Sequence, residues 1–280
     1  VLPRLRHQLL RRLLRAWPFP RGQGRLIDRT GVGNLHFEED ELETTTDAGF
    51  AMTVRPNDLV GRHIYLTGQF DRTICDVLLA YLRGVDRPHV LDIGANIGFV
   101  SCDIAHRLPG AQVVAVEPVP ETFRLLSTNL ERVAGERGRS INAAISDTPG
   151  TLRMRTFPDN MGQSCISDDG DLEVDVVTGA QLLEQSGFQR LDAVKIDVQG
   201  FELQVLRGLE HALATHRPRA VLFEQEKPWN AEPGETIPEL FGRLDYAIFG
   251  LRKRLLKWSL EPIDTSPDAS VDHDCVAVPR

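Results

Sequence analysis

From residue 88 onward, short apolar runs alternate with segments in which apolar residues recur every three or four positions. Runs of about four to eight apolar residues are typical of buried strands, and the longer period is typical of helices with one buried face. This alternation predicts an open α/β fold, with a mostly parallel sheet covered by helices on both faces. The predicted strands are HVLDI (89–93), QVVAVE (112–117), SINAAIS (140–146), LDAVKIDV (191–198) and RAVLFEQ (219–225), and the predicted helices cover 97–107, 120–133 and 201–215.

Four further segments have strand-like patterns that do not fit the strand–helix alternation. YAIFGL (246–251) and DCVAVP (274–279) could pair antiparallel at one edge. That pairing would give a mostly parallel seven-stranded sheet with an antiparallel edge hairpin. LRMRTF (152–157) and LEVDVV (172–177) are interpreted as extended pieces of an insertion.

The part of the chain before residue 88 has a different organisation. Residues 38–56 predict a strand pair that turns at 47–49, and a helix is expected to begin after Asp71, a residue type that favours the N-cap position. The sequence therefore divides into three segments. They are a basic helix and linker (1–34), an extension with a strand pair and helices (35–87), and the α/β domain (88–280).

The first 17 residues predict an amphipathic helix. Leu2, Leu5, Leu9, Leu13 and Trp17 recur at helical spacing, and most arginines lie on the other side. The favoured interpretation is that the leucines pack on the protein's own body while the arginines face its acids. The alternative is a weak contact with an anionic membrane surface.

Composition and charge narrow the function classes. With 280 residues, 41% of them hydrophobic, the chain can form one substantial core. Residues 1–30 carry eight arginines and one acid, a net charge of +7. Because the net charge of the whole chain is −8, the remaining residues carry −15. An acidic main body argues against nucleic acid as a partner, because its phosphates would be repelled.

The cysteines and the apolar runs indicate the compartment. The four cysteines are scattered with no C-x-x-C pair, which argues against zinc and against a disulfide framework. No apolar run has the length of a transmembrane helix, and the N-terminus shows no signal-peptide pattern. We therefore expect no metal site and a cytoplasmic protein, with peripheral membrane contact as the alternative.

The first predicted strand leads into a glycine-containing turn, DIGANIGF (92–99). A dinucleotide fingerprint needs glycines at the positions of Gly94, Asn96 and Phe99, and only the first matches. Asp92 would also repel a pyrophosphate delivered to the next helix. A carboxylate there suits a ligand with cationic parts and no phosphate, such as S-adenosylmethionine, and Gly94 and Gly98 would allow close approach of its nucleoside.

The second predicted strand ends in Glu117, 19 residues beyond Gly98. An acid at this strand tip is placed to accept hydrogen bonds from both ribose hydroxyls. The simpler alternative is a solvated strand end beside an ordinary glycine turn. The turn and the spaced acid together favour S-adenosylmethionine binding.

The fourth predicted strand carries the charged residues Lys195 and Asp197, which point to the same side because they are two apart. Buried charges are costly unless they are paired, and ligands bind at the carboxyl edge of open parallel sheets. Asp197 is the first candidate for a general base, oriented by Lys195, and the alternative is a purely structural ion pair. Glu202 could be catalytic or cap the next helix, and Glu224 could face an acceptor or lie in water.

Five sequence blocks together resemble the FkbM-type methyltransferase family over about residues 60–280. They are VLDIGANIGFVS, VEPVPETFRLLSTNL, NAAISDTPGTLRM, VKIDVQGFELQVLRG and the closing VAVP. The resemblance implies a Rossmann-like class I methyltransferase fold and methylation that depends on S-adenosylmethionine.

The resemblance also implies roles for individual residues. Glu117 would bind the ribose, Asp147 would lie near the adenine, and Asp197 would lie beside the transferring methyl. The family usually has Glu where this chain has Gln199, so an acid's role at that position is in doubt here. The residues implied to line the methionine and nucleoside are Asp92, Gly94, Ala95, Asn96 and Gly98.

The predicted function is O-methylation of a hydroxyl on a sugar, in a glycan or glycolipid, or on a secondary metabolite. This substrate class rests on the family resemblance alone. Alternatives are N- or carboxyl-methylation of a small molecule, a NAD-dependent Rossmann oxidoreductase, and a non-catalytic nucleoside-binding module. The loop 158–171 could lie over the cofactor, and we expect it to be an ordinary flexible loop.

Overall fold

The computed structural model describes most of the chain, and all structural statements below concern those residues. They are 2–19, 22–23, 27, 36–157, 160–225, 228–229, 234–266, 269 and 273–280, without the side chains of 2–7 and 273. Most of the predicted linker at 18–34 therefore lies outside the described residues.

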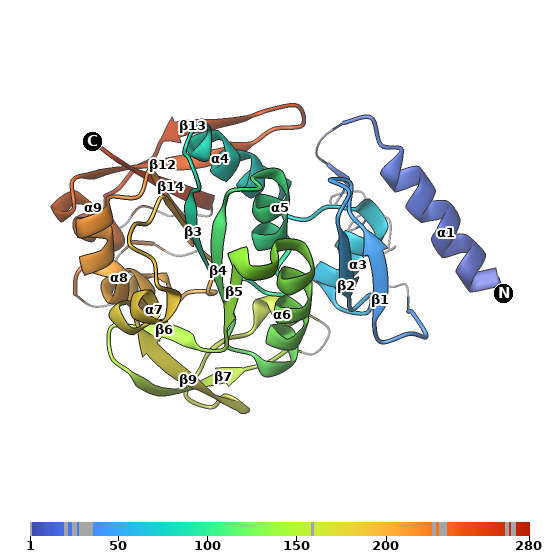
Figure 1. The fold of residues 1–280 in the computed structure, drawn as a ribbon, viewed down its shortest axis with the longest axis horizontal. Coiled ribbons are helices and arrows are strands. Elements are labelled where there is room, and N and C mark those ends of the chain that lie inside the picture. Colours follow the sequence, from blue (N-terminus) through green and yellow to red (C-terminus); the bar gives the residue numbers. More distant parts are fainter. Residues whose placement is uncertain are drawn as a thin grey trace.

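The main sheet has eight strands in the order β13-β12-β14-β11-β10-β3-β4-β5 (Figure 1). The five neighbouring strands from β11 to β5 are parallel, which confirms the predicted α/β class. Their order reverses between β3 and β10, and ligands of such sheets bind at this switch point. The bounds are β3 His89–Ile93, β4 Gln112–Val116, β5 Gly138–Ile141, β10 Ala193–Ile196, β11 Ala220–Gln225, β12 Tyr246–Lys253, β13 Trp258–Pro262 and β14 His273–Pro279.

Helices cover both faces of this sheet, and each face has its own apolar core (Figure 1). On one face α6 buries Leu125, Leu126 and Leu130, and on the other α8 buries Leu206 and Leu209. The first face carries α4 Arg72–Leu82, α5 Phe99–Arg107 and α6 Pro120–Ala134, and the second α7 Gly179–Ser186, α8 Glu202–His216 and α9 Ile237–Arg243.

The predicted antiparallel pairing of 246–251 with 274–279 is present, as β12 with β14, but the edge of the sheet differs from the prediction. The last strand, β14, is inserted between β11 and β12 and pairs antiparallel with both. The hairpin at the edge is instead formed by β12 and β13, so the sheet has one strand more than predicted.

The predicted third strand, 140–146, is divided between two sheets. β5 belongs to the main sheet, whereas β6 starts a four-stranded sheet of order β6-β9-β7-β8. The break falls at Asn142, whose amide nitrogen donates to the carbonyl oxygens of Glu117 and Pro118 at 2.8 and 2.9 Å. The bounds are β6 Ala144–Ser146, β7 Gly150–Arg155, β8 Cys165–Ile166 and β9 Leu172–Thr178, with the short 3-10 helix η3 Met161–Gln163 between β7 and β8.

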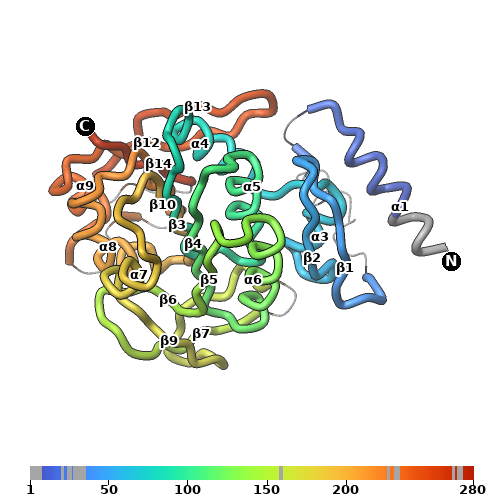
Figure 2. Tube along the Cα trace, in the orientation of Figure 1, coloured from blue at the N-terminus to red at the C-terminus, as the bar shows by residue number. Residues whose placement is uncertain are grey.

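The part of the extension that precedes α4 lies beside the first helical face, whereas α4 itself belongs to that face (Figure 2). The predicted strand pair is present as an antiparallel ladder, in which Thr45 pairs with Ala51. Asp58 caps α3 by accepting hydrogen bonds from the amides of Val60 and Gly61 at 3.0 and 3.2 Å. The bounds are β1 Leu42–Thr45, β2 Ala51–Val54 and α3 Leu59–Thr67.

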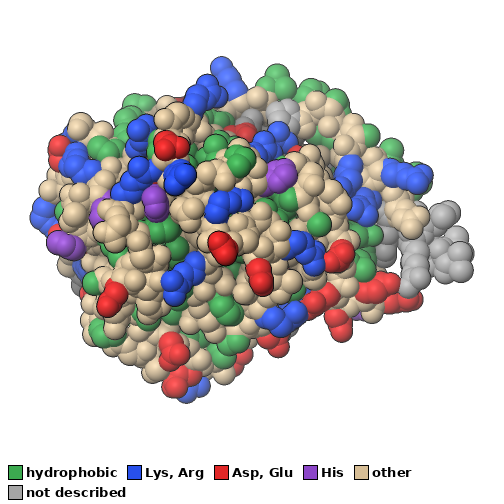
Figure 3. All heavy atoms as spheres, viewed as in Figure 1, with side chains coloured by type: hydrophobic (Ala, Val, Ile, Leu, Met, Phe, Trp, Pro, Cys, Tyr) green, Lys and Arg blue, Asp and Glu red, His purple; other side chains and the backbone are tan. Residues whose placement is uncertain are grey.

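The predicted N-terminal helix is α1, Leu2–Arg15, and it packs on the extension. Leu14 is buried against Leu66, and Leu10 packs beside them. The prediction is wrong for Leu9 and Leu13 of the apolar stripe, which are 61% and 63% exposed and do not pack on the body. Arg11 and Arg15 both donate to the hydroxyl of Thr44, at 2.8 and 2.9 Å. On the face shown in Figure 3, basic and acidic side chains are interspersed. No helix among the described residues has the length and hydropathy needed to span a bilayer.

Candidate active site

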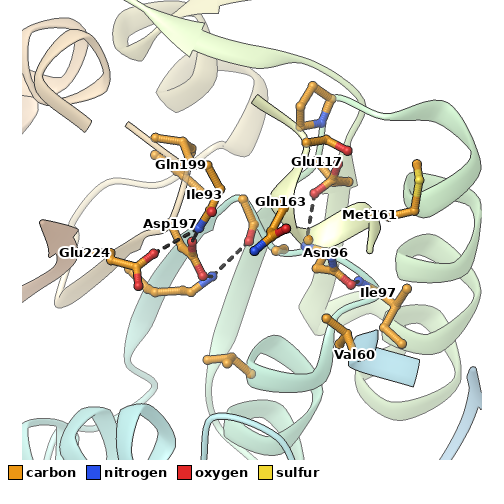
Figure 4. Close-up of a pocket in the computed structure, with 18 of the residues that line it drawn as sticks. Val60, Ile93, Asn96, Ile97, Glu117, Met161, Gln163, Asp197, Gln199 and Glu224 are labelled. Carbon is orange, nitrogen blue, oxygen red and sulfur yellow. Dashed lines mark hydrogen bonds and ion pairs between the residues drawn. The ribbon is translucent and has the colours of Figure 1, made fainter. Parts of the chain in front are cut away.

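A pocket of about 340 Å³ lies at the carboxyl ends of β3, β4, β10 and β11, at the switch point of the sheet. Its volume is in the usual range of small-molecule sites, about 300–1,000 Å³. The glycine turn, α3 and η3 all contribute residues to the pocket lining (Figure 4). The site is therefore assembled from the main sheet, the insertion and the N-terminal extension.

The glycine turn is fixed against the neighbouring strands. The amides of Gly94 and Ala95 donate to the carbonyl oxygen of Val116 at 2.9 and 3.0 Å. Gly94 has a φ of 71°, and a Cβ there would lie 1.7 Å from the carbonyl oxygen of Asp197. Only glycine allows this close approach of two backbone segments. Gly94, Ala95 and Asn96 all line the pocket.

Gly98 has a packing role in the structure. A Cβ at this position would lie 2.7 Å from Leu126 Cδ1, so the glycine lets the start of α5 approach α6. Gly98 does not belong to the pocket lining, although its neighbours Ile97 and Phe99 do.

Asp92 points into the protein and away from the pocket. It is 1% exposed, accepts a hydrogen bond from the Ser101 hydroxyl at 2.7 Å, and lies 3.3 Å from the ammonium of Lys195. The cause is strand register, because Asp92 on β3 is directly opposite Lys195 on β10. The structure thus does not place Asp92 where a cofactor would touch it, and its negative charge is balanced inside the sheet.

Lys195 connects the buried part of the site to the pocket. Its Nζ donates to the Gly94 carbonyl at 2.9 Å and lies 3.5 Å from Asp197 Oδ2. Burial by itself would lower the pKa of Lys195, but Asp92 and Asp197 outweigh burial and raise it. Lys195 therefore stays charged, stabilises the glycine turn and provides a positive charge beside Asp197.

Glu117 lies at the tip of β4 and lines the pocket. One carboxylate oxygen accepts a hydrogen bond from the amide of Asn96 at 3.1 Å (Figure 4). The other accepts one from the amide of Val119 at 3.0 Å. Burial raises the pKa of Glu117 to about 7, although these two amide bonds oppose the increase. The carboxylate retains acceptor capacity towards the pocket, which suits a diol.

Asp197 and Glu224 both line the pocket, and Gln199 connects them (Figure 4). The Gln199 amide nitrogen donates to Asp197 Oδ1 at 3.0 Å and to Glu224 Oε2 at 2.9 Å. Gln199 holds this position with a left-handed φ of 53°. This neutral amide donates to both carboxylates and so holds them close together. Asp197 is one-third exposed and accessible to a ligand.

Glu202 and Asp147 lie outside the pocket lining. Glu202 is 6% exposed, and its Oε1 accepts hydrogen bonds from the amides of Val198 and Gly200, so it holds the turn after β10. Burial raises its pKa to about 6. Asp147 is exposed and accepts hydrogen bonds from the hydroxyls of Ser146 and Thr148. The same segment instead contributes the apolar residues 143–145 to the pocket.

Several residues that line the pocket were not predicted. Asp71 occupies the N-cap position of α4 but makes no capping hydrogen bond through its side chain. Lys253 and Asp274, from β12 and β14, form an ion pair. The described part of the predicted loop at 158–171 contributes Met161, whose amide donates to Asp58 at 2.8 Å. These residues come from separate chain segments, and their assembly depends on tertiary structure.

The combination of fold and site defines a class of protein. A Rossmann-type sheet carries a pocket at its switch point, with a buried acid at the second strand tip and no dinucleotide glycine fingerprint. These features are those expected of an S-adenosylmethionine-dependent methyltransferase.

The chain belongs to the FkbM methyltransferase family, because residues 92–254 match the Methyltransferase FkbM domain. This assignment confirms the predicted family, enzyme class and cofactor. Membership of a methyltransferase family argues against the NAD-dependent oxidoreductase.

Individual relatives share moderate similarity with the chain. Hexuronic acid methyltransferase AglP of Haloferax volcanii is 31% identical over 49% of this chain and 57% of its own length. The 31-O-demethyl-FK506 methyltransferase FkbM of Streptomyces tacrolimicus is 32% identical over 47% of this chain and 65% of its own length. The chain thus spans less than two thirds of each.

Among solved structures, an S-adenosylmethionine-dependent methyltransferase from Agrobacterium tumefaciens is similar over 88% of this chain and 72% of its own, with 13% identity and a TM-score of 0.47.

Proposed function

We propose that this enzyme methylates a hydroxyl group of a sugar in a glycan or glycolipid, or of a secondary metabolite. The observation that carries the proposal is Asp197, a carboxylate that faces the pocket between Lys195 and Gln199. An alcohol is a weak nucleophile, so its methylation benefits from a base that removes the proton during attack. The names of two relatives, a hexuronic acid methyltransferase and a 31-O-demethyl-FK506 methyltransferase, support this substrate class.

The residues of the pocket fit the cofactor. Glu117 offers carboxylate oxygens for the ribose hydroxyls, and Gly94 lets the turn pack against the Asp197 backbone at the pocket lining. Apolar side chains suit the adenine ring, namely Ala144, Ile145, Met161 and Ile166.

The bound cofactor supplies an electrophilic methyl group on a sulfonium centre. Asp197 accepts the proton of the acceptor hydroxyl at its carboxylate. Gln199 holds Asp197 Oδ1 at 3.0 Å, and the Lys195 ammonium, 3.5 Å from Asp197 Oδ2, provides a positive charge beside this carboxylate. Glu224, bound to the same Gln199 amide, is placed to accept a hydrogen bond from a second acceptor hydroxyl.

Radiolabelled S-adenosylmethionine, incubated with glycan and metabolite extracts of the source cells, tests the proposal. We expect label in products that survive mild alkali, because methyl ethers resist hydrolysis whereas methyl esters do not. Label that mild alkali releases would favour carboxyl methylation, and label confined to amines would favour N-methylation. Either result would contradict the proposed reaction.

We also propose a role for each segment before the catalytic domain. Residues 88–280 would form that domain, and residues 35–87 would complete its pocket, to which they contribute Val60, Phe70 and Asp71. Helix α1, within segment 1–34, would dock on the extension and not on a membrane, as its contacts with Thr44 and Leu66 support.

For the compartment we propose the cytoplasm, because the four cysteines are scattered along the sequence without a C-x-x-C pair. Co-sedimentation with anionic vesicles that depends on residues 1–17 would contradict the docking proposal.

A further inference from the structure

Two aspartates of this chain begin helices, and they behave differently. Asp58 has an extended backbone, with φ −81° and ψ 149°, and its carboxylate caps the first amides of α3. Asp71 stands at the same position of α4 but is left-handed, with φ 43° and ψ 35°, and its carboxylate makes no capping bond. A helix start does not require this conformation, because the extended backbone of Asp58 allows capping.

The side chain of Asp71 contributes to the wall of the cofactor pocket. Its charged neighbours there are the cations Lys195 and Lys253 and the acids Asp197 and Asp274. Burial raises the pKa of Asp71 to about 6. The carboxylate is therefore partly desolvated in a pocket that binds a cationic ligand.

The neighbouring cations already have closer partners. Lys253 is in an ion pair with Asp274, and Lys195 contacts Asp92 and the Gly94 carbonyl. Among the described residues, no hydrogen bond or ion pair is formed by the Asp71 carboxylate. It is thus an acceptor in the pocket that is left for a ligand.

We propose that Asp71 binds the α-ammonium group in the methionine part of S-adenosylmethionine. That group carries three N–H donors and a positive charge, and a buried carboxylate is a strong partner for it. Of the other acceptors in the pocket, the Gly94 carbonyl binds Lys195 Nζ, and Asp197 Oδ1 binds Gln199. The extension would then provide part of cofactor recognition from outside the family-matched region 92–254.

Calorimetry with two ligands tests this assignment. S-adenosylhomocysteine retains the ammonium group, and 5′-methylthioadenosine lacks the whole amino-acid part. The variant is Asp71→Asn, because Asn tolerates the left-handed backbone, and Asp71→Gly is a second variant that accepts the same φ. Asp86→Asn is the control, because it removes an exposed charge outside the pocket.

We expect both Asp71 variants to weaken S-adenosylhomocysteine binding by about tenfold, the effect of one charge-assisted hydrogen bond. Binding of 5′-methylthioadenosine should stay within about twofold of the wild type. Equal losses for both ligands would mean that Asp71 only supports the pocket structurally. No loss for either would mean that it does not touch the cofactor, and both results overturn the assignment.

If the wild type bound neither ligand, the cofactor pocket itself would be wrong. That failure is distinguishable from failure of the Asp71 assignment.

Discussion

Glu117 gives the protein a pH-dependent stability that a single substitution should remove. Burial raises the pKa of this carboxyl from its usual 4.5 to about 7 in the folded protein. The folded state therefore binds the proton more tightly than the unfolded chain does. The stabilisation is fully present below about pH 4.5 and is lost as the pH rises through 7.

The size of the effect follows from the difference in pKa. Each pKa unit corresponds to about 1.4 kcal/mol, so the whole difference corresponds to about 3 kcal/mol. Roughly 2.5 kcal/mol of this falls between pH 5 and pH 8. At 7% exposure, solvent screens the side chain little. Glu117→Gln does not titrate, so its free energy of unfolding should fall less with pH than that of the wild type.

Glu117→Gln should also lower the stability of the folded state by an amount that does not depend on pH. Glu117 accepts from the amides of Asn96 and Val119 with separate oxygens, and Gln has only one acceptor oxygen. The loss of one bond should destabilise the variant by about 1–3 kcal/mol at every pH. The prediction therefore concerns how steeply the free energy of unfolding changes with pH, and not the pH-independent loss of stability.

Urea denaturation at pH 5, 6, 7 and 8 measures this slope. Asp71 and Glu202 also titrate in this range, because burial raises their pKa values to about 6. Their contributions cancel when the free energy of unfolding of the variant is subtracted from that of the wild type at each pH. Glu136→Gln, an exposed site, is the control and should follow the wild type. A wild-type-minus-variant difference that stays constant from pH 5 to 8 would refute the reasoning about Glu117.

Three further substitutions test other parts of the site. Glu117→Ala should weaken binding of S-adenosylmethionine at least about tenfold in calorimetry, since two ribose hydrogen bonds are lost, and an unchanged affinity would exclude the ribose role. Asp197→Asn should lower methyl transfer by about 10²–10⁴-fold while cofactor affinity changes little, and normal turnover would exclude it as the base. Lys195→Met should destabilise the protein by about 3–5 kcal/mol in urea denaturation, because Asp92 is left buried without its cation, whereas the exposed Lys257→Met should have no effect.

The strand–helix alternation was predictable because each element carries its own periodicity. Two helices that were not predicted, α7 and α9, had local signals in the sequence. Thr178 and Gln181 form a capping box at the start of α7, and Thr236 and Glu239 form one at α9. The position of β14 had no such signal, because the pairing of a strand depends on residues far away in the chain.

The candidate active site also has some features that local sequence signals predict and others that depend on tertiary structure. Glu117 and Gly94 could be found because strand tips and glycine turns are local features. The inward orientation of Asp92 depends on the register between β3 and β10, which places it opposite Lys195. Asp71 resembles an ordinary helix cap in the sequence, and only its left-handed backbone turns the carboxylate from capping to the pocket.

A crystal structure of the complex with S-adenosylhomocysteine tests the central claim most directly. We predict both ribose hydroxyls within about 3.2 Å of the Glu117 carboxylate, and the thioether sulfur turned towards Asp197. A ligand bound elsewhere, or bound in this pocket with its ribose away from Glu117 and its sulfur away from Asp197, would contradict the account.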